Sequence, residues 1–120
     1  MFYADQHMHS SVSFDSHSSR SDMAAAAAQA GLSALCFTDH YDVVDEHGAF
    51  VPHYDWAPAR EAHAQAQKDW GDQLFLGFGI EVGNAPEDFS MAERIISEPG
   101  LDLVIGSIHN GSAALKHQDY

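Results

Sequence analysis

The sequence Ser33-Ala34-Leu35-Cys36-Phe37 is a short apolar run with no polar interruption after Ser33. A run of this kind is typical of a strand that is buried on both faces of a parallel sheet. On its N-terminal side, residues 22–30 are predicted to form a helix, with Ser21 as the N-cap and Gly31 as the stop. The local unit is therefore a helix that leads into a buried strand.

The same alternation continues outward from this unit. Strands are predicted over residues 2–6, 74–80 and 101–105, and helices over residues 57–70 and 88–97. A polar loop of about 18 residues follows the stretch above; it is longer than most connections and is a candidate functional loop. The order βαβαβαβ implies an α/β fold with a parallel sheet and right-handed helical crossovers. A small open sheet and part of a (β/α) barrel both fit this order.

Composition narrows the classes of partner. The chain has 120 residues, which suits a single domain, and 5 lysines and arginines against 18 aspartates and glutamates give a formal charge of −13. This balance argues against binding to nucleic acid or to an anionic membrane, and it favours a site for cations. No apolar run approaches the roughly 20 residues that span a bilayer. The single cysteine, Cys36, excludes an intrachain disulfide and favours a cytoplasmic location.

Histidines and carboxylates follow the predicted strands directly. The first strand leads into His7-Met8-His9, and alternate side chains of an extended chain point the same way. His40 follows the second strand, Glu81 the third and His109 the fourth. In parallel α/β folds, ligands gather beyond the carboxyl ends of the strands. Four successive strand ends of this kind predict a metal site.

The residue types indicate which metals and which chemistry. Imidazole and carboxylate suit Zn²⁺, Mn²⁺ or Fe²⁺, and Cys36 is expected to pack in the core because it lies inside its strand. Glu81, central among the strands, is the candidate for a carboxylate that bridges two cations. Two metals about 3.5–4 Å apart can clamp the attacking and leaving oxygens of a phosphoryl displacement. The small residues Gly79, Gly83 and Gly106 would let backbone and substrate approach closely.

Several neighbouring residues have two interpretations. Asp5 could fix an imidazole tautomer or be an ordinary polar group at a strand end, and Asp39 could orient His40 or cap the loop. Tyr54 and Trp56, with the aspartate between them, could contribute to a lid, although an aromatic pair before a helix is more often a hydrophobic staple.

The other polar residues are expected at the surface. We expect a solvated loop for Asp42, Asp45 and Glu46. The remaining histidines are expected to be mostly exposed, and two of them, His17 and His53, could line a substrate pocket; the full set is His17, His47, His53, His63 and His117.

Taken together, the motifs resemble the PHP (polymerase and histidinol phosphatase) family. The pieces that match are Asp5-x-His7-x-His9 with Ser13-x-Asp15, Phe37-Thr-Asp-His40, Gly79-Ile-Glu81-Val-Gly83 and Gly106-Ser-Ile-His109. They occur in the family's order and cover residues 5–110. They look closest to the histidinol-phosphatase branch, since Asp15 stands where some relatives carry histidine.

The resemblance implies a distorted (β/α)7 TIM-like barrel that holds two or three divalent metal ions at the carboxyl ends of its strands. By that similarity, His7 and His9 would bind one ion, and Glu81 would bridge it to a second ion that also takes His109. These four residues would act in catalysis through a hydroxide held by the ions.

The same similarity implies the remaining ligands and the reaction. Asp15 and His40 would help to hold a third ion. The hydroxide would attack the phosphorus of a phosphate monoester, and the expected substrate is L-histidinol phosphate, a small metabolite of histidine biosynthesis. The implied enzyme is a phosphoric monoester hydrolase.

The chain departs from the family pattern in its extent. Family members of this kind are considerably longer, and their later part supplies a further histidine, an Asp-x-His pair and basic residues that bind phosphate. His117 and Asp119 are not expected to replace these ligands, and none of the five basic side chains can be assigned to a substrate phosphate. We therefore expect one PHP-like domain that is incomplete at its C-terminus: a fragment, a half that pairs with a second copy or another chain, or a degenerate remnant. Left alone, it would expose the edge of a parallel sheet.

Other functions stay open at this stage. A PHP-type exonuclease or a phosphoesterase of other specificity is one alternative, although the acidic surface argues against DNA as substrate. A noncatalytic metal-binding or assembly module is another. An amidohydrolase-type deaminase also begins with two histidines on a barrel strand, but neither Lys68 nor Lys116 ends a strand to serve as its carbamylated lysine.

Overall fold

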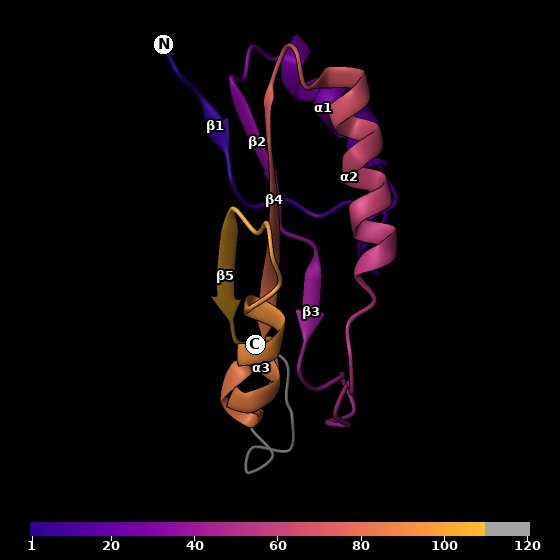
Figure 1. The fold of residues 1–120 in the computed structure, drawn as a ribbon, viewed down its shortest axis with the longest axis vertical. Coiled ribbons are helices and arrows are strands. Elements are labelled where there is room, and N and C mark those ends of the chain that lie inside the picture. Colours follow the sequence, from indigo (N-terminus) through magenta and orange to yellow (C-terminus); the bar gives the residue numbers. More distant parts are fainter. Residues whose placement is uncertain (110–120) are drawn as a thin grey trace.

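The computed structural model describes residues 1–109, which form a parallel sheet with helices packed beside it (Figure 1). In chain order the elements are β1 (Ala4–Asp5), α1 (Arg20–Gln29), β2 (Ala34–Phe37), β3 (His40–Asp42), α2 (Trp56–Trp70), β4 (Phe75–Gly83), the 3₁₀ helix η1 (Ala85–Glu87), α3 (Phe89–Ile96) and β5 (Leu103–Ser107). Every pairing between these strands is parallel, which confirms the predicted class.

The predicted second strand continues past its expected end. Phe37 of β2 is the register partner of Phe78 on β4, and His40 of β3 is the partner of Glu81, so one register runs through both strands. The prediction of an uninterrupted polar loop after Phe37 is therefore wrong at its start. The side chains of this segment are polar because it lies at the candidate site, and a polar strand has no apolar run to mark it.

Strand β4 is the centre of the sheet. Its residues Phe75 and Glu81 donate backbone hydrogen bonds to Ser33, just before β2, and to Asp39, just before β3, and its other edge pairs with β5 over Gly79–Gly83. β1 pairs with the outer edge of β2. Counting β2 and β3 as one interrupted strand, each strand lies beside the next one in the sequence, as predicted for successive (β/α) units.

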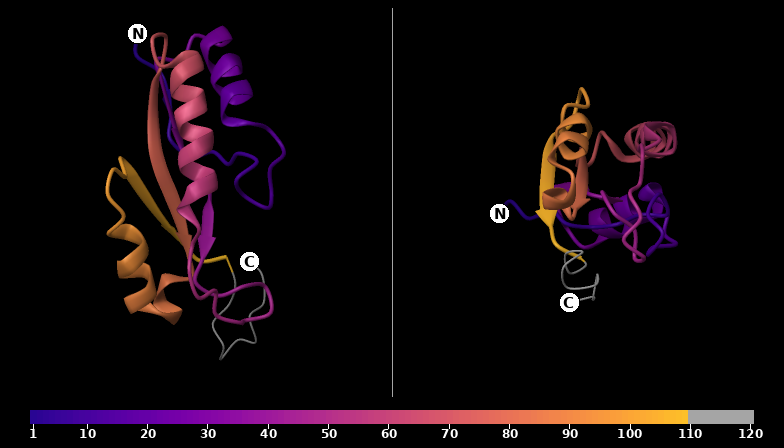
Figure 2. Two further views of the ribbon diagram at one scale, coloured as in Figure 1. Left: turned by 45° about the vertical axis from the view of Figure 1, so that its right-hand side comes forward. Right: turned by 90° about the horizontal axis from the view of Figure 1, so that it is seen from below.

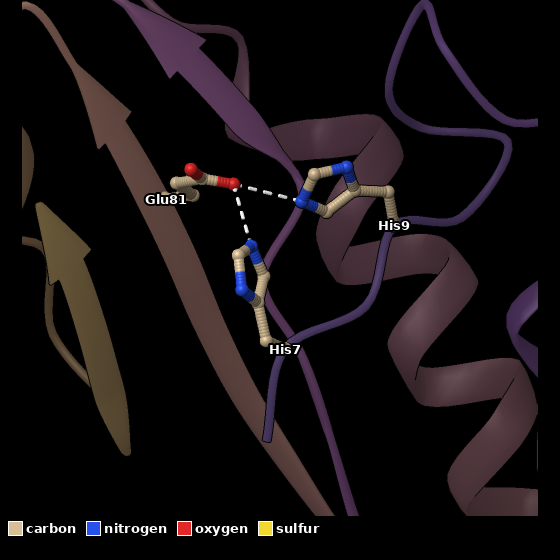
Figure 3. A group of neighbouring side chains, drawn as sticks. All are labelled: His7, His9 and Glu81. Atoms are coloured by element: carbon tan, nitrogen blue, oxygen red, sulfur yellow. Dashed lines mark hydrogen bonds and ion pairs between the residues drawn. The ribbon is translucent and has the colours of Figure 1, made fainter. Parts of the chain in front are cut away.

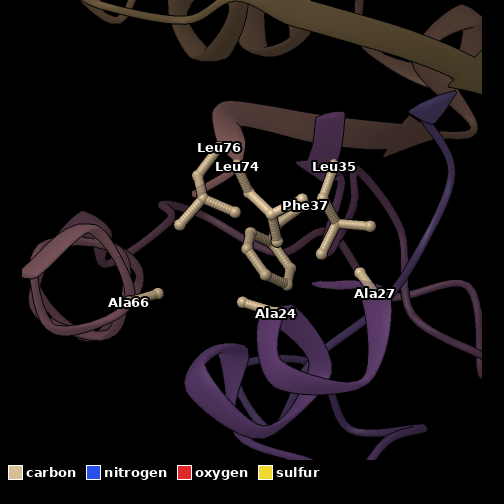
Figure 4. Packing of buried hydrophobic residues seen from close by; sticks show 7 residues of the cluster. All are labelled: Ala24, Ala27, Leu35, Phe37, Ala66, Leu74 and Leu76. Atoms are coloured by element: carbon tan, nitrogen blue, oxygen red, sulfur yellow. The ribbon is translucent and has the colours of Figure 1, made fainter. Parts of the chain in front are cut away.

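Helices α1 and α2 lie side by side along one face of β2 and β4 (Figures 1 and 2). The core between them holds two strand leucines, Phe37 and small helix alanines that allow close packing (Figure 4). The alternation of a strand places Ile80 and Val82 in a second cluster on this covered side. Glu81 therefore projects from the opposite face.

Polar caps set the helix boundaries. The side chain of Ser19 accepts a hydrogen bond from the backbone N–H of Asp22, so α1 begins earlier than predicted. The predicted cap, Ser21, instead donates its hydroxyl to Asp69 of α2. Asp55 caps α2 and Asp88 caps α3 in the same way as Ser19. Within residues 1–109 no helix combines the length and the apolar character that a membrane crossing requires.

Candidate metal centre

The site lies on the face of the sheet opposite α1 and α2, at the carboxyl ends of the strands. Period-two alternation and the shared register place Glu81, His40 and Asp42 on this face. His7 and His9 follow β1, and His109 follows β5. The sheet thus gathers side chains from segments that are far apart in the sequence.

Glu81 is the centre of the cluster. Its Oε2 atom lies 2.9 Å from Nε2 of His7 and 2.8 Å from Nε2 of His9 (Figure 3). Its Oε1 atom lies 2.9 Å from Nε2 of His109. The two oxygens of one carboxylate therefore face different histidines, which is the arrangement that a bridging ligand requires.

Asp15 and His40 extend the cluster on the His9 side. Oδ2 of Asp15 lies 2.7 Å from Nδ1 of His9 and 3.2 Å from Nε2 of His40. Nδ1 of His40 lies 3.6 Å from Oε2 of Glu81. All six residues predicted as metal ligands are thus in one neighbourhood.

Asp42 is a member of the cluster that the sequence interpretation placed on a solvated loop. Its carboxylate oxygens lie 2.9 and 2.8 Å from Nδ1 of His109, and Oδ1 lies 3.8 Å from Nδ1 of His40. The pattern His40-x-Asp42 repeats the alternation of His7-x-His9. This spacing would have pointed to Asp42 once the segment was recognised as a strand.

The charges of the cluster are strongly coupled. Burial by itself raises the pKa of Glu81, but hydrogen bonds from His7, Ser107 and His109 outweigh it and lower that pKa to about 2. Burial disfavours a charged His109, yet the carboxylate of Asp42 raises the pKa of this imidazole. The pKa of His9 is raised in the same sense, against its burial, by Asp15. The cluster therefore favours positive charge beside its carboxylates.

The donor set fits divalent metal ions. Three groups of side chains each offer ligand atoms within 4.8 Å of one another: His7, His9 and Glu81; His9, Asp15 and His40; and His40, Asp42 and His109. The Nδ1 atom of His40 is buried without a hydrogen-bond partner. Imidazole nitrogens and carboxylate oxygens with no thiolate among them suit Zn²⁺, Mn²⁺ or Fe²⁺.

A buried ion pair supports the loops that carry the histidines. Nη2 of Arg20 lies 2.7 Å from Oδ2 of Asp39, and both side chains are almost fully buried. Asp39 also accepts hydrogen bonds from the backbone N–H and the hydroxyl of Ser10. Ser10 follows His9, and His40 follows Asp39. The pair therefore fixes the backbone beside two cluster residues, and the hydrogen-bond partners of the Asp39 carboxylate are Ser10 and Arg20 rather than His40.

The glycines near the cluster behave differently from one another. A Cβ at Gly83 would overlap the carboxylate of Asp42 and lie 2.6 Å from Nδ1 of His109. A Cβ at Gly79 would lie 2.9 Å from the carbonyl oxygen of Leu103 on β5. Among residues 1–109, no heavy atom outside its chain neighbours lies within 4 Å of a Cβ at Gly106. Close approach is seen at Gly83 and Gly79, whereas the described residues leave the space beside Gly106 open.

Of the other residues considered in the sequence, some lie as predicted and others do not. Cys36 is buried in the sheet, as expected, and burial raises its pKa to about 11. Asp5 accepts a hydrogen bond from the backbone N–H of His7, which is the role of a polar group at a strand end. His63 is not exposed as expected, because its ring packs against Phe37 and Phe78.

Tyr54 and Trp56 flank Asp55, the N-cap of α2, and Trp56 is the first residue of the helix, so their contact is not the N′–N4 contact of a hydrophobic staple. The rings of Tyr54 and Trp56 are 4.6 Å apart between centroids and contact the second core cluster. His17 and His47 are exposed, and His53 is an exposed residue that lines a cavity. His117 and Asp119 lie outside the described residues.

The fold and the cluster together define a class: an α/β protein of successive parallel units with a histidine–carboxylate centre at the carboxyl ends of its strands. The family model described as the PHP domain matches residues 5–120. The chain therefore belongs to the PHP domain family.

Two relatives are histidinol phosphatases. A probable histidinol-phosphatase of Deinococcus radiodurans is 31% identical over 107 residues, covering 88% of this chain and 41% of the relative. The crystal structure of histidinol phosphate phosphatase from Lactococcus lactis, complexed with zinc, L-histidinol and phosphate, matches with a TM-score of 0.73 and 26% identity. That match covers 92% of this chain and 41% of the other. The chain thus spans about two fifths of the length of either relative.

Proposed function

We propose that this chain carries the metal centre of a phosphatase that hydrolyses L-histidinol phosphate to L-histidinol and phosphate. The observation that carries the proposal is the position of Glu81, whose two oxygens face His7 and His9 on one side and His109 on the other. The family membership and the two histidinol-phosphatase relatives support the substrate.

The proposed ligands are those of the cluster, and they would hold two or three divalent ions: His7, His9, Asp15, His40, Asp42, Glu81 and His109. When bound, such ions lower the pKa of a water molecule and neutralise the oxygens of a phosphoryl group. Glu81, only 4% exposed and ionised at neutral pH, would supply negative charge to two ions at once.

The chain's own carboxylates would orient the imidazoles. If Nδ1 of His109 donates its hydrogen to Asp42, then Nε2 directs a lone pair towards Glu81. The same logic applies to His9, with Asp15 as the acceptor. A lone pair that faces a carboxylate is repulsive unless a cation lies between the two groups. These tautomers would therefore favour a cation between Nε2 and the carboxylate.

The whole enzyme would be a barrel of which this chain supplies the first part. The match to about two fifths of each relative supports this proposal. Further strands, from a longer product or from a second chain, would then complete the sheet. A cytoplasmic location and a role in histidine biosynthesis follow from the proposed substrate.

Metal content and phosphate release test the proposal together. We expect the chain, together with the strands that complete its sheet, to retain two or three equivalents of zinc, manganese or iron and to release phosphate from L-histidinol phosphate. Glu81→Gln should remove the activity and lower the metal content, because the amide cannot supply charge to two cations. Glu93→Gln is the matched control, since Glu93 is an exposed residue of α3.

The results of these measurements distinguish a phosphatase from a noncatalytic metal-binding module. Unchanged turnover in Glu81→Gln would refute its role. Metal retention without phosphate release would leave a noncatalytic metal-binding module, and absence of metal would contradict both functions.

A further inference from the structure

His109 lies just beyond the regular part of the sheet. Ser107 is the last residue of β5 with a register partner, and that partner is Gly83 at the end of β4 (Figure 1). Ile108 is 52% exposed, so its side chain gains little from packing and holds the segment weakly. The position of His109 therefore depends on a contact beyond regular strand pairing.

Asn84 supplies this contact. Its Oδ1 atom accepts a hydrogen bond of 2.9 Å from the backbone N–H of His109, and its own N–H donates one of 2.8 Å to the carbonyl of Ser107. In a parallel ladder, one residue bonds through its N–H and its carbonyl to residues two apart on the neighbouring strand. Asn84 makes both of these bonds to β5, but its side-chain oxygen takes the place of the carbonyl.

The backbone conformation of Asn84 explains why the side chain is used. Its φ is 58°, in the left-handed region, and among residues 1–109 the other residues with positive φ are glycines. This conformation turns the chain out of β4 into η1, where the carbonyl of Asn84 accepts the N–H of Glu87 at 3.0 Å. The carbonyl is therefore not directed at β5. Asparagine tolerates the left-handed region better than most residues, and its amide oxygen can replace the carbonyl.

We propose that Asn84 is a positioning residue for His109: its side chain lengthens the ladder between β4 and β5 by one step and so holds the imidazole against Glu81 and Asp42. Asn84 is only 1% exposed, so its hydrogen bond to His109 is shielded from water. The ring of His109 lies 2.9 Å from Oε1 of Glu81 and 2.8 Å from Oδ2 of Asp42. The consequence for metal binding rests on the proposed function, whereas the contact itself needs no ion.

A double-mutant cycle on zinc affinity tests the inference, with the chain and the strands that complete its sheet. Asn84→Gly removes the acceptor and keeps a residue that adopts the left-handed turn without strain. We expect zinc affinity, measured by competition with a chelator, to fall about tenfold. In a His109→Ala background the same substitution should change the affinity by no more than about twofold, because the residue that Asn84 positions is absent.

Gln73→Gly is the matched control. It also replaces an amide side chain by hydrogen, but in an exposed turn before the other end of β4, so zinc affinity should be unchanged. Equal losses from Asn84→Gly with and without His109 would show a general weakening of the sheet and overturn the inference. An unchanged affinity in Asn84→Gly alone would overturn it as well.

Hydrogen exchange in the metal-free protein separates this inference from the proposed function. Asn84→Gly should speed exchange of the His109 amide about 3- to 10-fold, which corresponds to the loss of one hydrogen bond. The amide of Glu81, which bonds to Asp39 at the other edge of β4, should exchange as before. This result without any zinc binding would retain the role of Asn84 and refute the metal centre. Zinc binding with unchanged exchange of the His109 amide would retain the metal centre and refute the role of Asn84.

Discussion

His109 and Asp42 meet across Gly83, with Nδ1 of the imidazole 2.8 Å from Oδ2 of the carboxylate. Asp42 on β3 and Ser107 on β5 are both register partners of Gly83, one from each side of β4. A side chain at position 83 would occupy the space of this contact. The absence of a side chain on the central strand therefore allows its two neighbours to share one site.

Gly83→Ala should damage the centre without unfolding the sheet. The added methyl group would displace Asp42 or His109, so we expect zinc affinity to fall at least about tenfold. Gly106→Ala is the control, because its Cβ would have no heavy atom within 4 Å in the part of the chain that the structure describes. Zinc affinity can be measured by competition with a chelator, and circular dichroism reports the fold. Similar affinities for the two variants would contradict the steric argument.

Asp42→Asn tests the residue that sequence reasoning missed. The amide is similar in size but neutral, so it no longer attracts a cation or favours one tautomer of His109. We expect a loss of about 10- to 100-fold in zinc affinity. Asp72→Asn, an exposed change of the same kind, should leave the affinity as it is. If Asp42→Asn leaves the zinc affinity unchanged, Asp42 is not a member of the metal centre.

Arg20→Met should lower the free energy of unfolding by about 3–5 kcal/mol, because it leaves the buried carboxylate of Asp39 without its partner. The measurement is urea denaturation at neutral pH. Arg94→Met, on an exposed position of α3, should change the free energy of unfolding little. If both variants unfold at the same urea concentration, the ion pair does not stabilise the loops of His9 and His40.

Stability should also depend on pH through His63. Burial lowers the pKa of this imidazole to about 4, and repulsion from Arg20 adds to the effect. The unfolded state takes up a proton below the ordinary pKa of 6.5 and the folded state does not, so stability falls as the pH drops from 6.5 towards 4. Because His63 is partly exposed, we expect a loss of about 1–2 kcal/mol.

His63→Phe should flatten this part of the stability profile. The other shifted groups act in different windows: the raised pKa values of His9 and His109 matter above pH 6.5, and the lowered value of Glu81 matters below pH 4.5. An equally steep profile between pH 6.5 and 4 in His63→Phe would assign the dependence to other groups.

Most of the candidate site could be predicted from two sequence signals: the alternation of side chains along a strand and the positions at which the strands end. Residues two apart in an extended chain share a face, and parallel strands in one sheet end at one edge, so the convergence of His7, His9, Glu81 and His109 follows from local patterns. The apolar runs of β2 and β4 and the helix between them are marked by equally local signals.

Contacts between distant segments determine which polar residues belong to the centre and which support it from outside. Asp42 looks like loop surface until β3 pairs with β4, and Asp39 looks like a loop cap until Arg20 reaches it across the core. His63 looks like an exposed helix residue until the sheet covers it. These roles depend on contacts between distant segments, and the identity of a polar residue does not reveal whether its partner will be water or another side chain.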